Sequence, residues 1–186
     1  MTLDVPPIVI MICILLAYAI ARAQLRAKRP DQAAAGLDRL LGTHPDMVEF
    51  VVSRADADRQ LGRDNAAFAR LEGALQDNPT SYALNIAYAE AALAAGKPAL
   101  AEKKLTKFRS FRPDDPRVYQ LLSRAAGDQD KRSTGHAFLA DYYYLIGELE
   151  AAILQLDIAL DQPNLDFYAS SKLESRRAAL QREKEV

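Results

Sequence analysis

The 186-residue chain carries 24 Lys and Arg against 25 Asp and Glu, and 49% of its residues are hydrophobic. This length fits one domain with a real core. Because neither sign of charge dominates, the composition gives no electrostatic reason to expect a nucleic acid partner. The single cysteine, Cys13, excludes an internal disulfide, and the two histidines stand far apart without a CxxC motif, so the sequence predicts no metal site and no cofactor.

The first predicted element is an apolar segment. Residues 5–21 contain no charge, Asp4 precedes them, and four basic residues follow by position 29. Such a segment is close to the lower limit for a membrane span, and a membrane anchor would favour a cytoplasmic domain behind it. A signal peptide is a second interpretation, with Ala-x-Ala triplets at 19–21 and 21–23 but no basic residue before the apolar core. In the third, residues 15–29 form the first helix of the domain, with Ile20, Ala21 and Gln24 at packing positions. The sequence leaves these alternatives open.

A 34-residue repeat follows this segment. Proline recurs at that interval, and three glycines are each followed by a small or apolar residue five, nine and twelve positions later. The prolines are Pro45, Pro79 and Pro113, and the glycines are Gly62, Gly96 and Gly147. The first unit matches less fully, because Arg29 and Pro30 stand at its turn.

These offsets are typical of two antiparallel helices joined by a tight turn. Glycine gives the backbone freedom that the end of the first helix needs, and small residues at facing positions, such as Ala55 and Ala67, allow the two helices to approach closely. Proline biases its predecessor away from helix, and the next helix begins at a capping residue such as Asp115 before Pro116. This is the tetratricopeptide-repeat pattern. We therefore predict an all-α fold, a tetratricopeptide-repeat α-solenoid with an irregular extra helix and a C-terminal capping helix.

The repeat register predicts the internal boundaries. Residues 1–16 form the apolar segment and residues 17–184 the solenoid, with units at about 14–47, 48–81, 82–115, an irregular 116–132, 133–163 and a capping helix at 164–184. Gly96 and Gly147 are 51 residues apart, one and a half repeats, which is why one extra helix is expected between them. Asn164 is the predicted cap of the last helix, whose polar outer side would close the solenoid.

Several stretches resemble one family in particular. They are HAFLADYYYLIGELEAAILQLDIAL at 136–160, DFYASSKLESRRAAL at 166–180, LNIAYAEAALAAGKPALAEKKL at 84–105 and DDPRVYQLLSRAAG at 114–127. They are similar to the C-terminal repeat domain of the BepA-type periplasmic zinc metallopeptidases, the beta-barrel assembly-enhancing proteases. The resemblance covers roughly residues 17–184. Its most specific parts are the tyrosine run, the one-and-a-half-repeat offset and the C-terminal helix.

The catalytic motif of that family does not occur in this sequence. The family carries HExxH on a helix, where two histidines bind zinc and a glutamate acts as base, and neither His44 nor His136 can supply it. We therefore expect no enzymatic activity. The resemblance implies only the non-catalytic module, which in the family sits against the protease domain and engages the outer-membrane protein assembly machinery.

The function expected from this resemblance is a protein-interaction scaffold in the cell envelope. Its partner would be a protein or peptide, such as the envelope assembly machinery or a peptidase domain, and the scaffold would be periplasmic or anchored in the inner membrane through its N-terminus. Cytoplasmic placement is the alternative. Two other functions stay open: the C-terminal fragment of a split zinc metallopeptidase, and a membrane-anchored scaffold of another envelope assembly pathway.

In each repeat, one side of the first of its two helices is expected to line a groove for the partner. The residues predicted there are Glu49, Val52, Asp56, Arg59, Ala83, Asn85, Ile86, Glu90, Arg117, Gln120, Arg124, Asp141 and Tyr144. Asp56, Ile86 and Glu90 stand where chaperone-binding repeat domains hold a carboxylate with Lys and Asn, so a chaperone-tail clamp is not favoured. A mixed, partly apolar groove suits an extended or helical peptide better. Packing between helices is the stronger alternative for Asn85.

The tyrosine run at 142–144 is the last candidate site. On a helix, His136 and Asp141 diverge by about 140°, so they do not form a catalytic pair. The repeat register places Tyr142 and Tyr143 in packing rows and turns Tyr144 toward the groove. Tyr144 is therefore the one tyrosine of the three that we predict to contact a partner.

Overall fold

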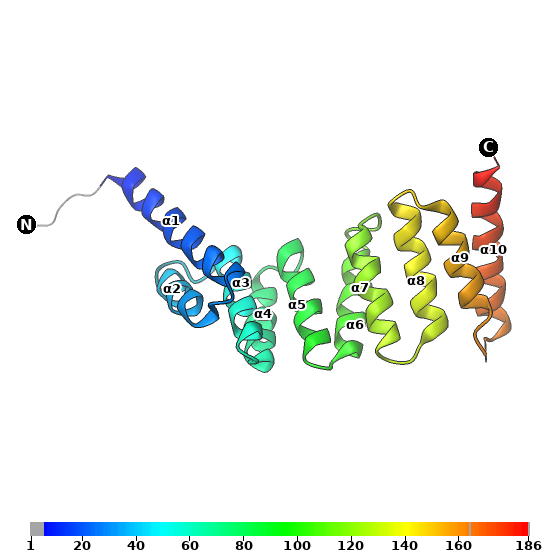
Figure 1. Ribbon diagram of the computed structural model, residues 1–186, viewed down its shortest axis with the longest axis horizontal. Helices are drawn as coiled ribbons and strands as arrows, with labels where there is room; N and C mark the ends of the chain where they lie inside the picture. Colours follow the sequence, from blue (N-terminus) through cyan, green and yellow to red (C-terminus); the bar gives the residue numbers. More distant parts are fainter. Residues whose placement is uncertain (1–5, 164, 186) are drawn as a thin grey trace, which may run out of the picture. The chain divides into compact units, whose positions relative to one another are not determined.

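The computed structural model describes residues 6–163 and 165–185, and every regular element in this part of the chain is an α-helix (Figure 1). The helices are α1 (Pro7–Arg26), α2 (Pro30–Thr43), α3 (Val48–Gln60), α4 (Asp64–Asp77), α5 (Tyr82–Ala94), α6 (Pro98–Arg109), α7 (Pro116–Gly127), α8 (Arg132–Leu145), α9 (Leu149–Leu160) and α10 (Phe167–Lys184). The prediction of an all-α fold is therefore confirmed.

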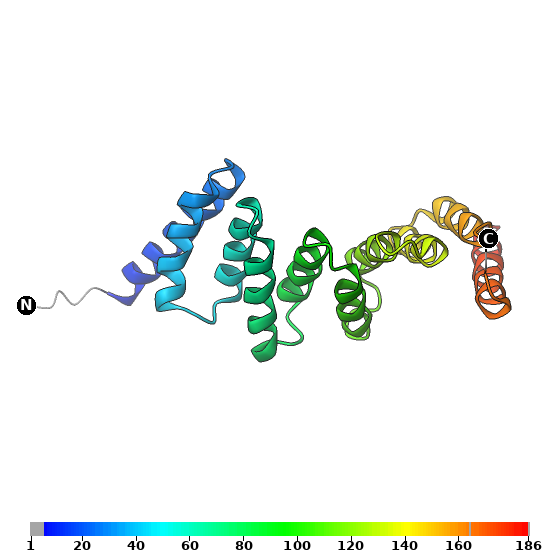
Figure 2. The ribbon, with the colours of Figure 1, turned by 90° about the horizontal axis from the view of Figure 1, so that it is seen from below.

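The chain divides into two compact units, Met1–Ala95 and Gly96–Val186. In the first unit α1 contacts α2 and α3, while α3 also contacts α4 and α5 (Figure 2). In the second unit α8 lies between α7 and α9, and α10 packs on α9. The boundary between the units falls inside the third expected repeat, 82–115, so the two helices of that repeat belong to different units. The boundary expected at residue 16 falls inside α1.

Several turns between consecutive helices use left-handed backbone conformations. The three glycines predicted to form turns all have positive φ, and two non-glycine residues share this conformation. The glycine φ values are 72° at Gly62, 67° at Gly96 and 84° at Gly147; the other two are 56° at Lys28 and 57° at Asp130. Lys28 thus takes the role of glycine between α1 and α2, where the sequence pattern was weakest. Asp130 turns α7 into α8, and α7 is the extra helix that the sequence predicted within 116–132.

Polar side chains cap the N-termini of several helices. The Asp115 carboxylate accepts hydrogen bonds from the backbone N–H groups of Arg117 at 2.9 Å and Val118 at 3.4 Å, which confirms the predicted cap of α7. Asn164, the predicted cap of the last helix, lies outside the described residues. Helix α10 begins at Phe167, and the Asp166 carboxylate accepts from the Ala169 N–H at 2.7 Å. The cap therefore lies two residues later than expected, because aspartate at 166 supplies the acceptor.

In the first unit, α1 packs one face onto α2 and α3. Ala21 and Leu25 are buried in a cluster with Ala33, Leu37 and Phe50, and the half-buried Ile14 and Tyr18 pack against it. This face follows helical spacing, i, i+4, i+7 and i+11. The expectation that Ile20 occupies a packing position is wrong: its side chain is 58% exposed, because position 20 falls on the opposite side of the helix.

A buried ionic network ties α2, α3 and α4 together. Arg54 on α3 donates from Nε to the Asp38 carboxylate on α2 at 2.6 Å and also pairs with Asp58 on its own helix. Arg70 on α4 reaches the same Asp58 carboxylate at 3.4 Å. Burial alone would lower the pKa of the Arg54 guanidinium, and the hydrogen bonds and charges of Asp38 and Asp58 outweigh it, so that pKa is raised. Because the Asp58 side chain is only 2% exposed, its negative charge depends on these two arginines.

The core of the second unit contains the predicted small-residue pair of its last repeat. Ala140 on α8 and Ala152 on α9 are both buried, in one cluster with Leu156 and Leu180. Leu180 comes from α10, so the C-terminal helix covers the apolar face that α8 and α9 would otherwise expose. This is the role that the sequence predicted for that helix.

We expect Asp58→Asn to lower the free energy of unfolding by about 3 kcal/mol, because it leaves the buried Arg54 without its closest anion. Asp38→Asn is the matched control: Asp38 is 55% exposed, so water can replace it, and its loss should cost about 1 kcal/mol or less. Urea unfolding followed by far-ultraviolet circular dichroism measures both values. Equal, small effects of the two substitutions would contradict the structural role given to the network.

A second prediction concerns the turn before α4. Gly62→Ala forces a side chain into the left-handed conformation at φ 72° and should destabilise the chain by about 1 kcal/mol, although there is space for the Cβ. Gly73→Ala, inside α4 and also with open space around the Cβ, should stabilise by about 0.5–1 kcal/mol through helix propensity. The same unfolding measurement tests whether these two substitutions have opposite signs.

Candidate functional site

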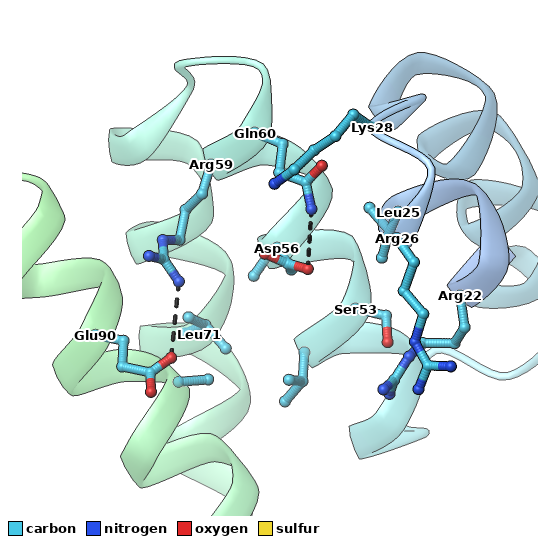
Figure 3. Close-up of a pocket in the computed structure, with 13 residues that line it drawn as sticks. Arg22, Leu25, Arg26, Lys28, Ser53, Asp56, Arg59, Gln60, Leu71 and Glu90 are labelled. Atoms are coloured by element: carbon cyan, nitrogen blue, oxygen red, sulfur yellow. Dashed lines mark hydrogen bonds and ion pairs between the residues drawn. The ribbon is translucent and has the colours of Figure 1, made fainter.

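The first unit contains a groove of about 420 Å³ formed by α1, α3, α4 and α5 (Figure 3). Its apolar side chains come from all four helices, and its polar side chains come from α1, from the turn after it, from α3 and from α5. The lining residues are Arg22, Leu25, Arg26, Lys28, Val52, Ser53, Ala55, Asp56, Arg59, Gln60, Leu71, Ala87 and Glu90. The groove therefore combines an apolar floor with charged edges.

Two internal contacts organise the charges on α3 and α5. Arg59 pairs with Glu90 across the groove, with 3.8 Å between Nη1 and Oε2, and both side chains remain about one-third exposed. Asp56 accepts a hydrogen bond from the Gln60 amide at 3.3 Å, one turn along the same helix (Figure 3). These contacts hold the side chains in place without burying them, so they stay available to a ligand.

The opposite edge of the groove is cationic and is positioned by Tyr18. The Tyr18 hydroxyl lies 3.1 Å from the Ser53 hydroxyl on α3, and Arg22 donates to the Tyr18 oxygen at 3.2 Å. Arg26 and Lys28 add two more cations: Arg26 extends from the end of α1, and Lys28 extends from the turn after it toward Gln60 (Figure 3). Among the described residues, neither of these two has an ion-pair partner. The groove has four cations against two anions, an excess of two positive charges.

The structure brings together four of the residues predicted for the groove. Val52, Asp56, Arg59 and Glu90 all line it. The cations of α1 were missed, because the sequence suggested that the basic residues after the apolar segment were flanks of a membrane span. The four-residue spacing of Tyr18, Arg22 and Arg26 on one helix face was the signal that could have identified them.

Three other predicted residues of this unit lie elsewhere. Glu49 is exposed at the start of α3, and its carbonyl oxygen is 3.4 Å from the Tyr18 hydroxyl. Ile86 is half-buried beside Ala87 but does not line the groove, and Ala83 is exposed on the preceding turn of α5.

The placement of Asn85 in the groove is wrong. Its side chain is buried, and its amide nitrogen donates to the carbonyl oxygens of Pro79 at 3.0 Å and Ser81 at 2.8 Å. These bonds satisfy backbone carbonyls between α4 and α5, so Asn85 has the packing role that was its stronger alternative.

The predicted residues of α7 are exposed and engage their own helix. Gln120 accepts a hydrogen bond from Arg117, and Arg124 lies 3.8 Å from the Asp128 carboxylate. They belong to the second unit, as do Asp141 and Tyr144.

A second, larger groove of about 1040 Å³ occupies the second unit. It is bordered by α8 and α10, with contributions from Arg109 on α6, Leu156 on α9 and the segment before α10. Asp141 lines it. Burial raises the pKa of the Asp141 carboxyl, while the charges of Arg176, Arg109 and Lys172 oppose that shift. The carboxylate is 3.7 Å from the Arg176 guanidinium, so Asp141 is already paired with a cation of the same unit.

The tyrosines at 142–144 do not present a free aromatic face to this groove. Tyr143 and Tyr144 both pack on the core cluster, and the rings of Tyr142 and Tyr143 are 5.3 Å apart. The Arg176 guanidinium lies 4.6 Å from the centre of the Tyr144 ring. Arg176 therefore occupies the face of the Tyr144 ring that it covers.

His136 and Asp141 have different partners, as the helical geometry predicted. His136 Nδ1 is 2.8 Å from the Gln155 amide oxygen on α9, whereas Asp141 faces Arg176 on α10. Within the described part of the chain, no three His, Cys, Asp or Glu residues are grouped so that they could hold a metal ion.

Comparison with known proteins agrees with this architecture. Residues 59–125 match the tetratricopeptide-repeat family model. The chain is 29% identical over 165 residues to the beta-barrel assembly-enhancing protease of Yersinia pestis, an alignment that covers 89% of this chain and 34% of the relative. The chain thus spans about a third of the length of the curated relatives it matches.

Solved structures show the same fold. The MamA fragment from residue 41 onward of Desulfovibrio magneticus RS-1 has a TM-score of 0.65 at 18% identity, with 93% of this chain and 97% of that chain covered. A thermophilic tetratricopeptide-repeat protein of Thermus thermophilus has a TM-score of 0.56 at 19% identity, with 90% and 98% covered. The chain is therefore a tetratricopeptide-repeat α-solenoid. Most of its length is similar to a segment that makes up about a third of the beta-barrel assembly-enhancing proteases.

Proposed function

We propose that this chain is a non-catalytic scaffold that binds an extended segment of another protein in the groove of its first unit. The observation that carries the proposal is the groove itself, in which four helices of one repeat array combine an apolar floor with charged edges. Concave sites that combine apolar side chains with convergent polar groups are typical binding sites. Extended and helical peptides are recognised by such surfaces through apolar anchors and backbone contacts.

The charges of the groove favour an acidic segment. Arg26 and Lys28 contribute positive charge that no ion pair within 6–163 and 165–185 compensates, while Asp56 and Glu90 are each already engaged by a neighbour. A peptide carboxylate near Arg26 and Lys28 would gain charge-assisted hydrogen bonds. Apolar side chains of the same segment would pack against Val52 and Ala87, the half-buried apolar residues of the lining.

We place this scaffold in the cell envelope, in assembly or quality control of envelope proteins. The support is the likeness to beta-barrel assembly-enhancing proteases and an apolar N-terminal helix long enough to reach into a membrane. The partner would be a component of the assembly machinery or a peptidase domain. The groove supplies binding groups and no constellation for hydrolysis, which favours a role without catalysis of its own.

A second candidate function follows from the partial coverage of the relatives. Because the chain spans about a third of their length, it fits the repeat module of a split or longer zinc peptidase as well. Reading the DNA upstream for a frame that encodes HExxH distinguishes the two. Such a frame, together with co-purification of its product with this chain, would favour the peptidase module over the independent scaffold.

The peptide-binding proposal predicts a charge-dependent affinity. A short labelled peptide of alternating glutamate and leucine should bind the chain, and the double variant Arg26→Glu, Lys28→Glu should bind it about tenfold more weakly, because two exposed attractions become repulsions. Fluorescence anisotropy at low and high salt measures this, and the difference should shrink as salt screens the charges.

The control variant is Arg39→Glu, the same charge change at an exposed site on α2 that does not line the groove. It should leave the affinity within about twofold of the wild type, because it is remote from the bound peptide. Equal weakening by Arg39→Glu, or equal binding of a lysine and leucine peptide, would show only nonspecific attraction and would count against the groove.

A further inference from the structure

The N-terminal half of α1 is apolar on every side. Residues 7–13 are all exposed, and among them Ile8, Val9, Ile10, Met11 and Ile12 have between 42% and 57% of their surface accessible. Successive helical residues are rotated by about 100°, so five consecutive apolar residues surround the helix. A protein partner on one side would require only an apolar stripe, whereas a helix apolar all round requires an apolar environment on all sides.

A bilayer provides such an environment, and the length of α1 is close to what a span needs. The helix has 20 residues, and its most apolar window of 18 residues has a mean hydropathy of 2.2, with only 11% of that window buried. At a rise of about 1.5 Å per residue it extends about 30 Å, close to the hydrocarbon thickness of a bilayer.

The contacts of α1 with the repeats limit how deep it can enter. From Ile14 onward one face of the helix packs on α2 and α3, and the Tyr18 hydroxyl contacts Ser53 and the Glu49 carbonyl. A full span would draw these polar groups of α3 into the hydrocarbon, where each unsatisfied group is costly. The free part, residues 7–13, rises about 10 Å, which is less than the roughly 15 Å of one leaflet.

The face opposite the packed one indicates how the helix meets the membrane. Leu16 and Ile20 are 59% and 58% exposed on that face, and they continue the line of Ile12. The basic residues Arg26, Lys28 and Arg29 follow this apolar stripe, in the last turn of the helix and just after it. A helix that enters at an angle places the stripe along the headgroup boundary and brings these cations within reach of anionic lipid.

We propose that α1 inserts obliquely into one leaflet of an anionic bilayer by residues 7–13, while its second half is the first helix of the repeat array. The same helix then holds the first unit at the membrane surface. This deepens the envelope placement proposed above and does not depend on peptide binding.

The single cysteine, Cys13, makes the insertion measurable in the full-length chain. It is exposed, in the last free residue before the packed part of α1. An environment-sensitive dye on Cys13, or on Ile8→Cys in a Cys13→Ser background, reports depth in vesicles of three parts phosphatidylethanolamine to one part phosphatidylglycerol. Quenchers placed near the headgroup or near the chain end of the lipid measure that depth.

We expect the fluorescence emission of both dyes to shift to shorter wavelength in the presence of vesicles. The dye on Ile8→Cys should be quenched more strongly by the quencher near the chain end, and the dye on Cys13 more strongly by the quencher near the headgroup. The same dye on Arg39→Cys, in the Cys13→Ser background, should stay in water. Ile12→Lys should weaken vesicle binding by tenfold or more without changing the circular dichroism spectrum, because it places a charge in the inserted turns.

The order of depths decides the proposal. If Cys13 is deeper than Ile8→Cys, α1 spans the bilayer and the one-leaflet insertion is wrong. If neither dye shifts and the chain sediments as a dimer, a second copy covers the apolar helix instead of lipid. Because no peptide is present, either result leaves the groove proposal to be judged by its own assay.

Discussion

The packing of α1 onto α2 and α3 is the interaction on which the proposed functions depend. Tyr18 and Leu25 fix the helix against the core, and Tyr18 also bonds Ser53 on α3. This contact makes α1 the cationic wall of the groove. In the membrane-bound state that we propose, it also limits the depth to which α1 enters the bilayer. Without it the groove would lose an edge and the apolar segment would be a simple anchor. A signal peptide cleaved after residue 21 or 23 would likewise remove Tyr18 from this core.

Arginine serves two different purposes in the first unit. Arg54 is buried, pairs with Asp38 and Asp58, and holds α2 and α3 together from inside. Arg26 and Lys28 are exposed at the groove, and in the part of the chain that the structure describes no anion pairs with them. The difference lies in desolvation: a buried guanidinium must be neutralised within the fold, whereas an exposed one keeps its hydration until a ligand arrives. The acidic partner proposed for the groove would supply Arg26 and Lys28 with the negative charge that Asp38 and Asp58 supply to Arg54.

The repeat pattern predicted the helices better than the groove. The spacing from Gly62 and Gly147 located turns that the structure builds with positive φ, because only local backbone geometry is involved. Asp115 capped its helix for the same reason. Groove membership was harder to predict: Val52 and Glu90 line the groove of the first unit, but Asn85 points to backbone carbonyls and Tyr144 lies under Arg176. Those outcomes depend on residues brought in from other helices, which repeat register does not contain.

The sequence by itself determined the all-helical repeat architecture, the positions of the glycine turns and the apolar character of the N-terminus, since each follows from local propensity and periodicity. Only the tertiary structure decided that Arg22, Arg26 and Lys28 share a groove with Asp56 and Glu90. It also decided that Asp58 is buried between two arginines. In the same way, it decided that the second half of α1 packs on the repeats and lines the groove, while the first half is exposed. These features join residues from different helices. They arise when whole helices pack, and a pattern along one helix cannot specify which neighbour its faces will meet.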